Sequence, residues 1–164
     1  MNENERCLEK ILWSIALPGL GQLLNGKLLK GLIFIVLEFL INTGSNLNEI
    51  IILSFQGENL QAVENTNYKW LMFYPCIYMY AIWDACKDSG GLKRPFAFIP
   101  FVFSAYMGTI GVIYSPVFIW KGALLGPLWL TILCFITGLL AGIVIQQLLA
   151  LYYSKIKFSP LNKK

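Results

Sequence analysis

Four side chains in otherwise apolar stretches are the best candidates for chemistry: Glu38, Tyr74, Tyr78 and Asp84. Glu38 follows Lys30 by eight residues, which is about 12 Å along a helix. That spacing places Glu38 near mid-membrane, where an ionised carboxylate is costly and is expected to be protonated, paired or in a polar cavity. Tyr74 and Tyr78, four residues apart on one helix face, are its expected partners.

Two interpretations of these acids remain open. Glu38 is either a neutral carboxyl that a tyrosine holds within the bundle, or a functional group. Asp84 precedes Lys87 by three residues, which favours an ion pair at a helix end. In the functional interpretation, Glu38 and Asp84 together line a proton or cation path.

Catalytic groups are scarce. The chain has no histidine, no nucleophile–base pair at a recognisable spacing and no phosphate-cradling loop, so no enzyme is predicted. The four cysteines form no CxxC pair, and they are expected to be small buried hydrophobes rather than metal ligands or a disulfide framework. No cofactor or metal is predicted, and no basic cluster alternates with aromatics as in nucleic-acid-binding proteins.

The composition indicates a membrane protein. Of the 164 residues 57% are hydrophobic and 13% are charged, and the mean hydropathy is +0.61. Soluble proteins contain roughly one quarter charged residues. The prediction is an all-α, polytopic membrane helix bundle, a single integral domain over residues 1–164 in the cell membrane, with the lipid bilayer as its first partner.

About four transmembrane helices are expected, since about 20 apolar residues cross a bilayer. Their predicted ranges are Leu28–Asn42, Tyr68–Asp84, Phe96–Ser115 and Pro127–Ala150. Pro100 predicts a kink inside the third. The polar segment Thr43–Asn67 is expected either to lie along the membrane surface or to cap the bundle.

The apolar stretch Ile11–Leu17 is too short to cross a bilayer before Pro18 interrupts it. It is predicted to be an interfacial or re-entrant helix. A true span that continues to Leu24 is the alternative.

The distribution of Lys and Arg predicts the orientation, because cytoplasmic loops carry the excess. With both termini and the loop 87–95 in the cytoplasm, that side holds eleven basic residues: Arg6, Lys10, Lys27, Lys30, Lys87, Lys93, Arg94, Lys155, Lys157, Lys163 and Lys164. Only Lys69 and Lys121 fall on the other side. The expected topology therefore has cytoplasmic N- and C-termini.

A glycine-rich run follows the first apolar stretch. Its distinctive residues are Pro18, Gly19, Gly21, Gln22, Asn25, Gly26 and Gly31. Glycines at this density indicate a bent backbone or close helix packing. Gln22 and Asn25 are expected to hydrogen-bond the carbonyls that Pro18 frees, and a ligand-binding turn at a broken helix is the alternative.

With the later Trp83-Asp84 pair, this run resembles the two-transmembrane-helix domain family. Gly19, Gly26 and Gly31 match the spacing of its glycine signature, although two leucines replace its aromatic pair. The resemblance covers about residues 10–90, with residues 1–90 as the related part, and implies an architecture but no single reaction.

Residues 91–164 lie outside that resemblance and are predicted to add a helical pair. Gly138 and Gly142 form a GxxxG pattern, which lets helices approach closely. Gly108 and Gly111 offer a matching surface on the preceding span, which favours packing within the chain over self-association.

Two functions follow as expectations. The first is a non-enzymatic accessory, scaffold or signalling module that contacts other membrane proteins or itself. The second is a small oligomeric transporter or channel for protons, ions or a small solute, with Glu38 on its path.

Overall fold

The computed structural model describes residues 3–157, and this part of the chain is helical almost throughout. The elements are α1 (Glu3–Ala16), α2 (Leu20–Leu24), α3 (Leu28–Ser45), α4 (Leu47–Phe55), α5 (Asn59–Glu64), α6 (Tyr68–Leu71), α7 (Tyr74–Asp88), α8 (Ile99–Tyr114), β1 (Ile119–Trp120), β2 (Ala123–Leu124) and α9 (Gly126–Lys157). The prediction of an all-α fold is confirmed. The only strands in residues 3–157 form a small antiparallel hairpin.

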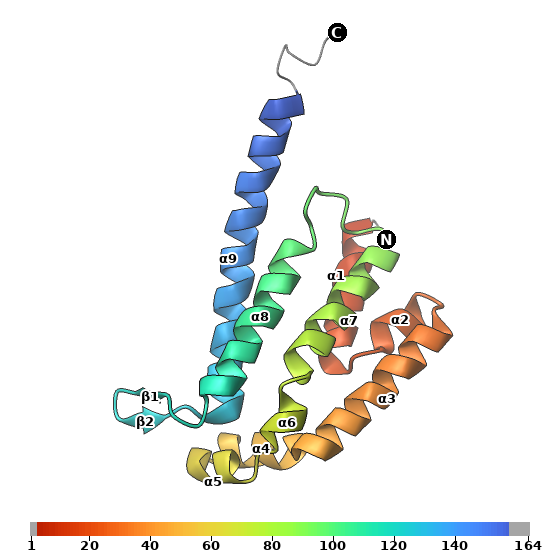
Figure 1. Ribbon diagram of the computed structural model, residues 1–164. Coiled ribbons are helices and arrows are strands. Elements are labelled where there is room, and N and C mark those ends of the chain that lie inside the picture. The colour runs from red at the N-terminus through yellow and green to blue at the C-terminus, as the bar shows by residue number, and fades with distance from the viewer. Residues whose placement is uncertain (1–2, 158–164) are drawn as a thin grey trace.

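The long helices run between two ends of the molecule (Figure 1). The start of α1, the α7–α8 connection and the end of α9 lie at what we call the upper end, and α4, α5 and the hairpin lie at the lower end. Most of the basic residues that were predicted to be cytoplasmic belong to elements at or near the upper end. Lys69 in α6 and Lys121 in the hairpin belong to the lower end. Lys163 and Lys164 fall outside the described residues, as does the side chain of Lys157.

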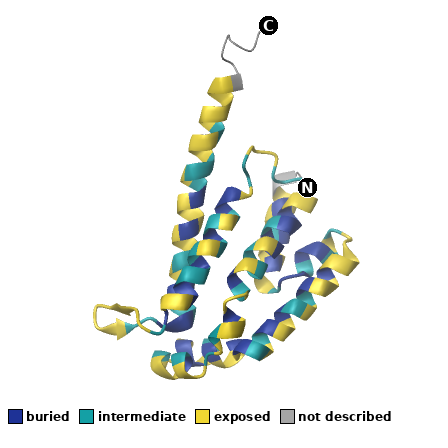
Figure 2. Ribbon diagram, viewed as in Figure 1, coloured by how far each residue is buried: buried dark blue, intermediate teal, exposed yellow. Residues whose placement is uncertain are grey.

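Two helices are long and apolar enough to cross a membrane. They are α3 and, within α9, Gly126–Ile156, with mean hydropathies of 1.6 and 2.5. The 16 residues of α8 extend only about 24 Å, less than the roughly 30 Å of a hydrocarbon core. Large apolar side chains are exposed along α3 and α9, including Leu29, Phe39, Leu140 and Leu148 (Figure 2). These surfaces suit a lipid environment.

Prolines set two helix boundaries that differ from the predictions. The expected span Tyr68–Asp84 is divided into α6 and α7, because Pro75 lies in the first turn of α7. The predicted kink at Pro100 is wrong for the same reason: α8 begins at Ile99, so the missing proline N–H falls where no intrahelical partner exists.

The segment between α3 and α6 covers the lower end of the bundle. Ile50 of α4 is fully buried, and it packs in one cluster with Leu71 of α6 and Val112 of α8. Trp129 of α9 donates its indole N–H to the carbonyl of Ser54 at 3.1 Å. Of the two alternatives for this segment, the structure therefore shows the cap.

Helices α8 and α9 pack through reciprocal glycine contacts. A Cβ atom on Gly142 would lie 2.5 Å from the Cα of Pro100, and one on Gly138 would lie 2.6 Å from the carbonyl oxygen of Phe103. In the opposite direction, a Cβ on Gly111 of α8 would lie 2.9 Å from the Cα of Thr131. Each helix thus has glycines at the contact, and a larger residue there would keep the other helix from approaching as closely.

Candidate functional site

The glycine-rich run and the Trp-Asp pair meet in space. Gln22 of α2 is fully buried, and its Nε2 donates to the carbonyl of Ala81 at 2.8 Å and to Oδ2 of Asp84 at 3.2 Å. Nδ2 of Asn25 donates to the carbonyl of Ala85 at 2.7 Å. The two amides therefore attach the α1–α3 segment to the last turns of α7. The expectation that they serve carbonyls freed by Pro18 is wrong.

At the end of α1 the side-chain partner is Tyr78, whose hydroxyl donates to the carbonyl of Ile15 at 2.8 Å, and backbone bonds close part of the turn. Leu17 donates its N–H to the carbonyl of Trp13, and Leu20 donates to the carbonyl of Leu17, both at 3.1 Å. The chain then reverses through Gly19, whose φ of 109° belongs to the left-handed region that favours glycine. Gln22 and Asn25 are thereby free to reach α7.

Close packing completes this contact between the α1–α3 segment and the last turns of α7, which we call the junction. A Cβ on Gly21 would collide with the hydroxyl of Ser14 and lie 2.7 Å from the Cβ of Ala85. A Cβ on Gly31 would collide with Leu23. Gly19, Gly21 and Gly31 thus allow three helices to meet, whereas a Cβ on Gly26 would meet nothing within 4 Å, and the φ of 72° at Gly26 indicates a turn.

Asp84 forms its ion pair with a residue distant in sequence. Its Oδ1 accepts from Nζ of Lys30 at 2.8 Å, and Asp88 accepts from the same ammonium at 3.0 Å. The predicted partner, Lys87, instead places Nζ 4.7 Å from the ring centroid of Trp83. The expected Asp84–Lys87 pair is therefore wrong, because the start of α3 brings a cation to the buried carboxylate.

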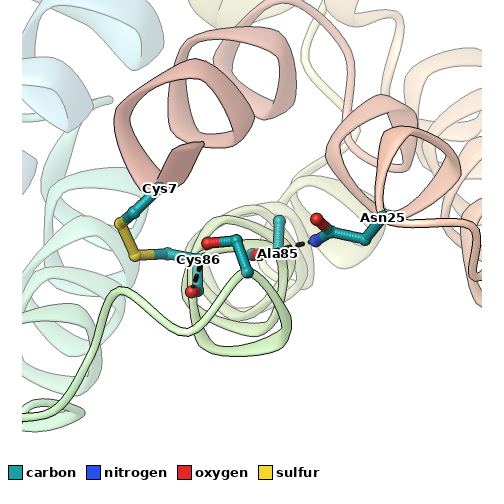
Figure 3. Close-up of a disulfide and its surroundings, with 5 residues drawn as sticks. Cys7, Asn25, Ala85 and Cys86 are labelled. Carbon is teal, nitrogen blue, oxygen red and sulfur yellow. Dashed lines mark hydrogen bonds between the residues drawn. A yellow bond between two sulfur atoms is a disulfide. The ribbon is translucent and has the colours of Figure 1, made fainter. Parts of the chain in front are cut away.

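Cys7 and Cys86 form a disulfide that joins α1 to α7, with Cα atoms 4.5 Å apart (Figure 3). Both residues are buried, and a Cβ on Gly91 would meet the Cys7 side chain. The expectation that all four cysteines act as simple hydrophobes is wrong for this pair. The two cysteines are 79 residues apart, so no local sequence pattern indicated that they pair.

Glu38 lies in a different environment, lower on α3. It is 7% exposed, and its carboxyl group lies close to the hydroxyl of Tyr74. The ring of Tyr78 stacks on Tyr74 with centroids 5.3 Å apart, but its hydroxyl donates to the carbonyl of Ile15 at 2.8 Å. Glu38 and Asp84 thus have separate partners, so the structure shows no direct link between the two predicted acids.

A cavity of about 210 Å³ adjoins the tyrosines. Tyr74, Tyr78 and Thr131 provide its polar groups, and the remainder of its wall is apolar. The hydroxyl of Thr131 is buried and has no hydrogen-bond partner among the described residues. Glu38 does not line this cavity, but its neighbour Tyr74 does.

The junction also contains polar residues that sequence analysis did not single out. Lys30 and Asp88 complete the ion-pair network, and Ser14 places a buried hydroxyl against Gly21. Lys30 immediately precedes Gly31, so its position beside the glycine-rich run could have identified it from the sequence. Among residues 3–157, no group of three or more His, Cys, Asp or Glu is arranged to hold a metal ion.

Comparison with known proteins gives no relative. No protein-family model, curated protein or solved structure matches this chain. The resemblance to the two-transmembrane-helix domain family therefore stays a prediction, which rests on the residues that meet at the junction.

Proposed function

We propose that the protein is a multi-pass membrane protein that acts without catalysis, as an accessory, scaffold or signalling component in contact with other membrane proteins. The polar residues of the junction support this proposal, because they bind one another. Gln22, Asn25 and Lys30 donate to acceptors on α7, which favours a structural role over a reaction.

The observation that carries the proposal is the projecting end of α9. Its 32 residues extend about 48 Å, well beyond the roughly 30 Å of a hydrocarbon core. The last turns rise past α8 and expose Leu148, Leu151 and Tyr152 (Figures 1 and 2). An apolar surface that leaves the bilayer is best covered by another protein.

The proposed topology has four crossings, made by α3, the α6–α7 pair, α8 extended by the turn residues 95–98 before it, and α9, with the upper end in the cytoplasm. The segment α1–α2 then enters from the cytoplasm and turns back at Pro18. The disulfide between Cys7 and Cys86 lies at this end, and the reducing cytoplasm would convert it to a buried thiol pair. The hydrogen bonds of Gln22, Asn25 and Tyr78 would still hold α1–α3 against α7.

A photo-cross-linking residue at Leu151 tests the proposal in the native membrane. We expect adducts with one discrete membrane protein, identified by mass spectrometry. Leu29 is the matched control, because it is an exposed leucine on the lipid-suited surface of α3 and is expected to yield lipid adducts. Identical adduct patterns at the two positions would contradict the proposed contact.

The second candidate is an oligomeric transporter or channel, which the Glu38–Tyr74 contact beside the 210 Å³ cavity favours. Such a protein should lose flux in reconstituted vesicles when Glu38→Gln is introduced. Glu49→Gln, at an exposed position of α4, is the control. The leading proposal predicts no specific flux from the unmodified protein and an unchanged Leu151 cross-link in both variants. Flux that only Glu38→Gln abolishes would favour the transporter.

A further inference from the structure

The β1–β2 hairpin exposes apolar side chains on both of its faces. Ile119 is 63% exposed and Trp120 is 58% exposed, and Ala123 of β2 is exposed as well. Paired residues share a face, so Trp120 and Ala123 lie on one face and Ile119 and Leu124 on the other. The hairpin also projects sideways from the start of α9, away from the helix bundle (Figures 1 and 2).

A hairpin of this kind needs an apolar environment beyond its own contacts. Its turn is well formed, since Lys121 and Gly122 have positive φ values of 49° and 86°, as a tight two-residue turn requires. The ring of Phe118 stacks on that of Trp120, with centroids 6.3 Å apart. An isolated two-stranded hairpin is nevertheless marginally stable at best in water. The exposed faces are therefore best explained by a surface that covers them.

The position of the hairpin along the chain places it at the boundary of a candidate span. β2 ends at Leu124, and Gly126 begins α9, in which Gly126–Ile156 is long and apolar enough to cross a membrane. Only Leu125 separates the two elements. A two-stranded hairpin has open edges, and open sheet edges are not tolerated against lipid in the hydrocarbon core. The headgroup region, where water and lipid polar groups can bind those edges, is the depth that suits it.

The charge of the segment favours the same environment. Between Tyr114 and Gly126 the only charged residue is Lys121, which lies at the hairpin tip. Tryptophan is enriched at membrane–water interfaces, and a lysine ammonium there can extend to the lipid phosphates. An antiparallel sheet that docks on a protein commonly keeps its other face polar and solvated, and this hairpin has no such face.

We propose that the hairpin is an interfacial anchor, which inserts Phe118, Ile119 and Trp120 among the lipid headgroups at the lower end, with the Lys121 ammonium at their phosphates. The inference rests on the membrane placement proposed above and adds the headgroup region as the partner of this surface. Such an anchor fixes the depth of α9 at its first residue. The excess length of α9 then emerges at the upper end.

A diazirine-bearing amino acid at Ile119 tests the anchor in the full chain, reconstituted in vesicles of phosphatidylglycerol and phosphatidylcholine. We expect lipid adducts, identified by mass spectrometry. Leu60 is the matched control: it is 62% exposed at the same end of the molecule, but the other exposed residues of α5, Gln61 and Glu64, are polar, so water should capture its carbene. Equal lipid capture at the two positions, or capture of a second copy of the chain at Ile119, would overturn the proposal.

The lysine has its own matched pair. Lys121→Gln should lower the ratio of phosphatidylglycerol to phosphatidylcholine adducts at Ile119 at least twofold, because a lysine near the membrane surface attracts anionic lipid. Lys69→Gln, at an exposed lysine of α6, should leave that ratio unchanged. An unchanged ratio in Lys121→Gln would contradict the headgroup contact.

The same cross-linker at Leu29 of α3 separates this inference from the membrane placement. Lipid adducts at Leu29 without lipid adducts at Ile119 would overturn the anchor alone. Their absence at both positions would overturn the placement, and the anchor with it. Neither result depends on the protein contact proposed for Leu151, so failure of that contact is distinguishable from failure of the anchor.

Discussion

Gly142→Leu is expected to lower the free energy of unfolding by about 3 kcal/mol. The new side chain would begin 2.5 Å from the Cα of Pro100, a backbone atom in the first turn of α8, which cannot yield as a flexible side chain would. The helices must therefore separate along their whole contact. Thermal unfolding in detergent, followed by circular dichroism, measures the loss.

Ala141→Leu is the control for this prediction. Ala141 precedes Gly142 on the same helix, but it is exposed, so the added leucine should meet lipid or detergent. We expect its midpoint of unfolding to stay close to that of the unmodified protein. If both leucines destabilise equally, the close approach at Gly142 is not what holds α8 against α9.

Asp84→Leu is expected to cost about 1.5–3 kcal/mol, the range for a lost hydrogen bond to a charged group. Asp84 is 4% exposed and accepts from both Lys30 and Gln22. Without the Asp84 carboxylate, α2 and the start of α3 lose the polar contact that they share with α7. The same unfolding assay measures the change.

Asp88→Leu makes the same chemical change one helical turn later. Asp88 accepts a hydrogen bond from Lys30 at 3.0 Å, and that bond is solvent-exposed. Exposed ion pairs contribute about 1 kcal/mol or less, so a small effect is expected. If Asp88→Leu lowers the free energy of unfolding as much as Asp84→Leu does, the burial of Asp84 does not add to the stability of the protein.

The sequence predicted features that depend on local chemistry. The helical fold follows from long apolar stretches, the reversal near Pro18 from the proline and its neighbouring glycines, and the α8–α9 surfaces from glycine spacing. The interpretation of Glu38 as a carboxyl held by a tyrosine named Tyr74 as a candidate partner, and that contact is present. The first three signals lie within a few residues, whereas the Glu38–Tyr74 contact joins α3 to α7 and was suggested by polar side chains in apolar stretches.

The features that sequence analysis missed depend on distant contacts or on an overlooked proline. Lys30 competes with Lys87 for Asp84 only because α3 starts beside the end of α7, and Cys7 reaches Cys86 only because α1 packs there. Pro75, by contrast, was visible in the sequence, and its preference for a first helical turn accounts for the break between α6 and α7.

Accessibility of single cysteines most directly tests the central claim, a multi-pass membrane protein with its upper end in the cytoplasm. In a background without the four native cysteines, Glu58→Cys and Lys121→Cys mark the lower end, and Lys93→Cys marks the upper end. The proposed topology predicts that a membrane-impermeant maleimide labels the first two in intact cells and labels Lys93→Cys only after permeabilisation. Labelling of all three from outside, or of Lys93→Cys alone, would contradict it, and the latter result would place Cys7 and Cys86 where a disulfide persists.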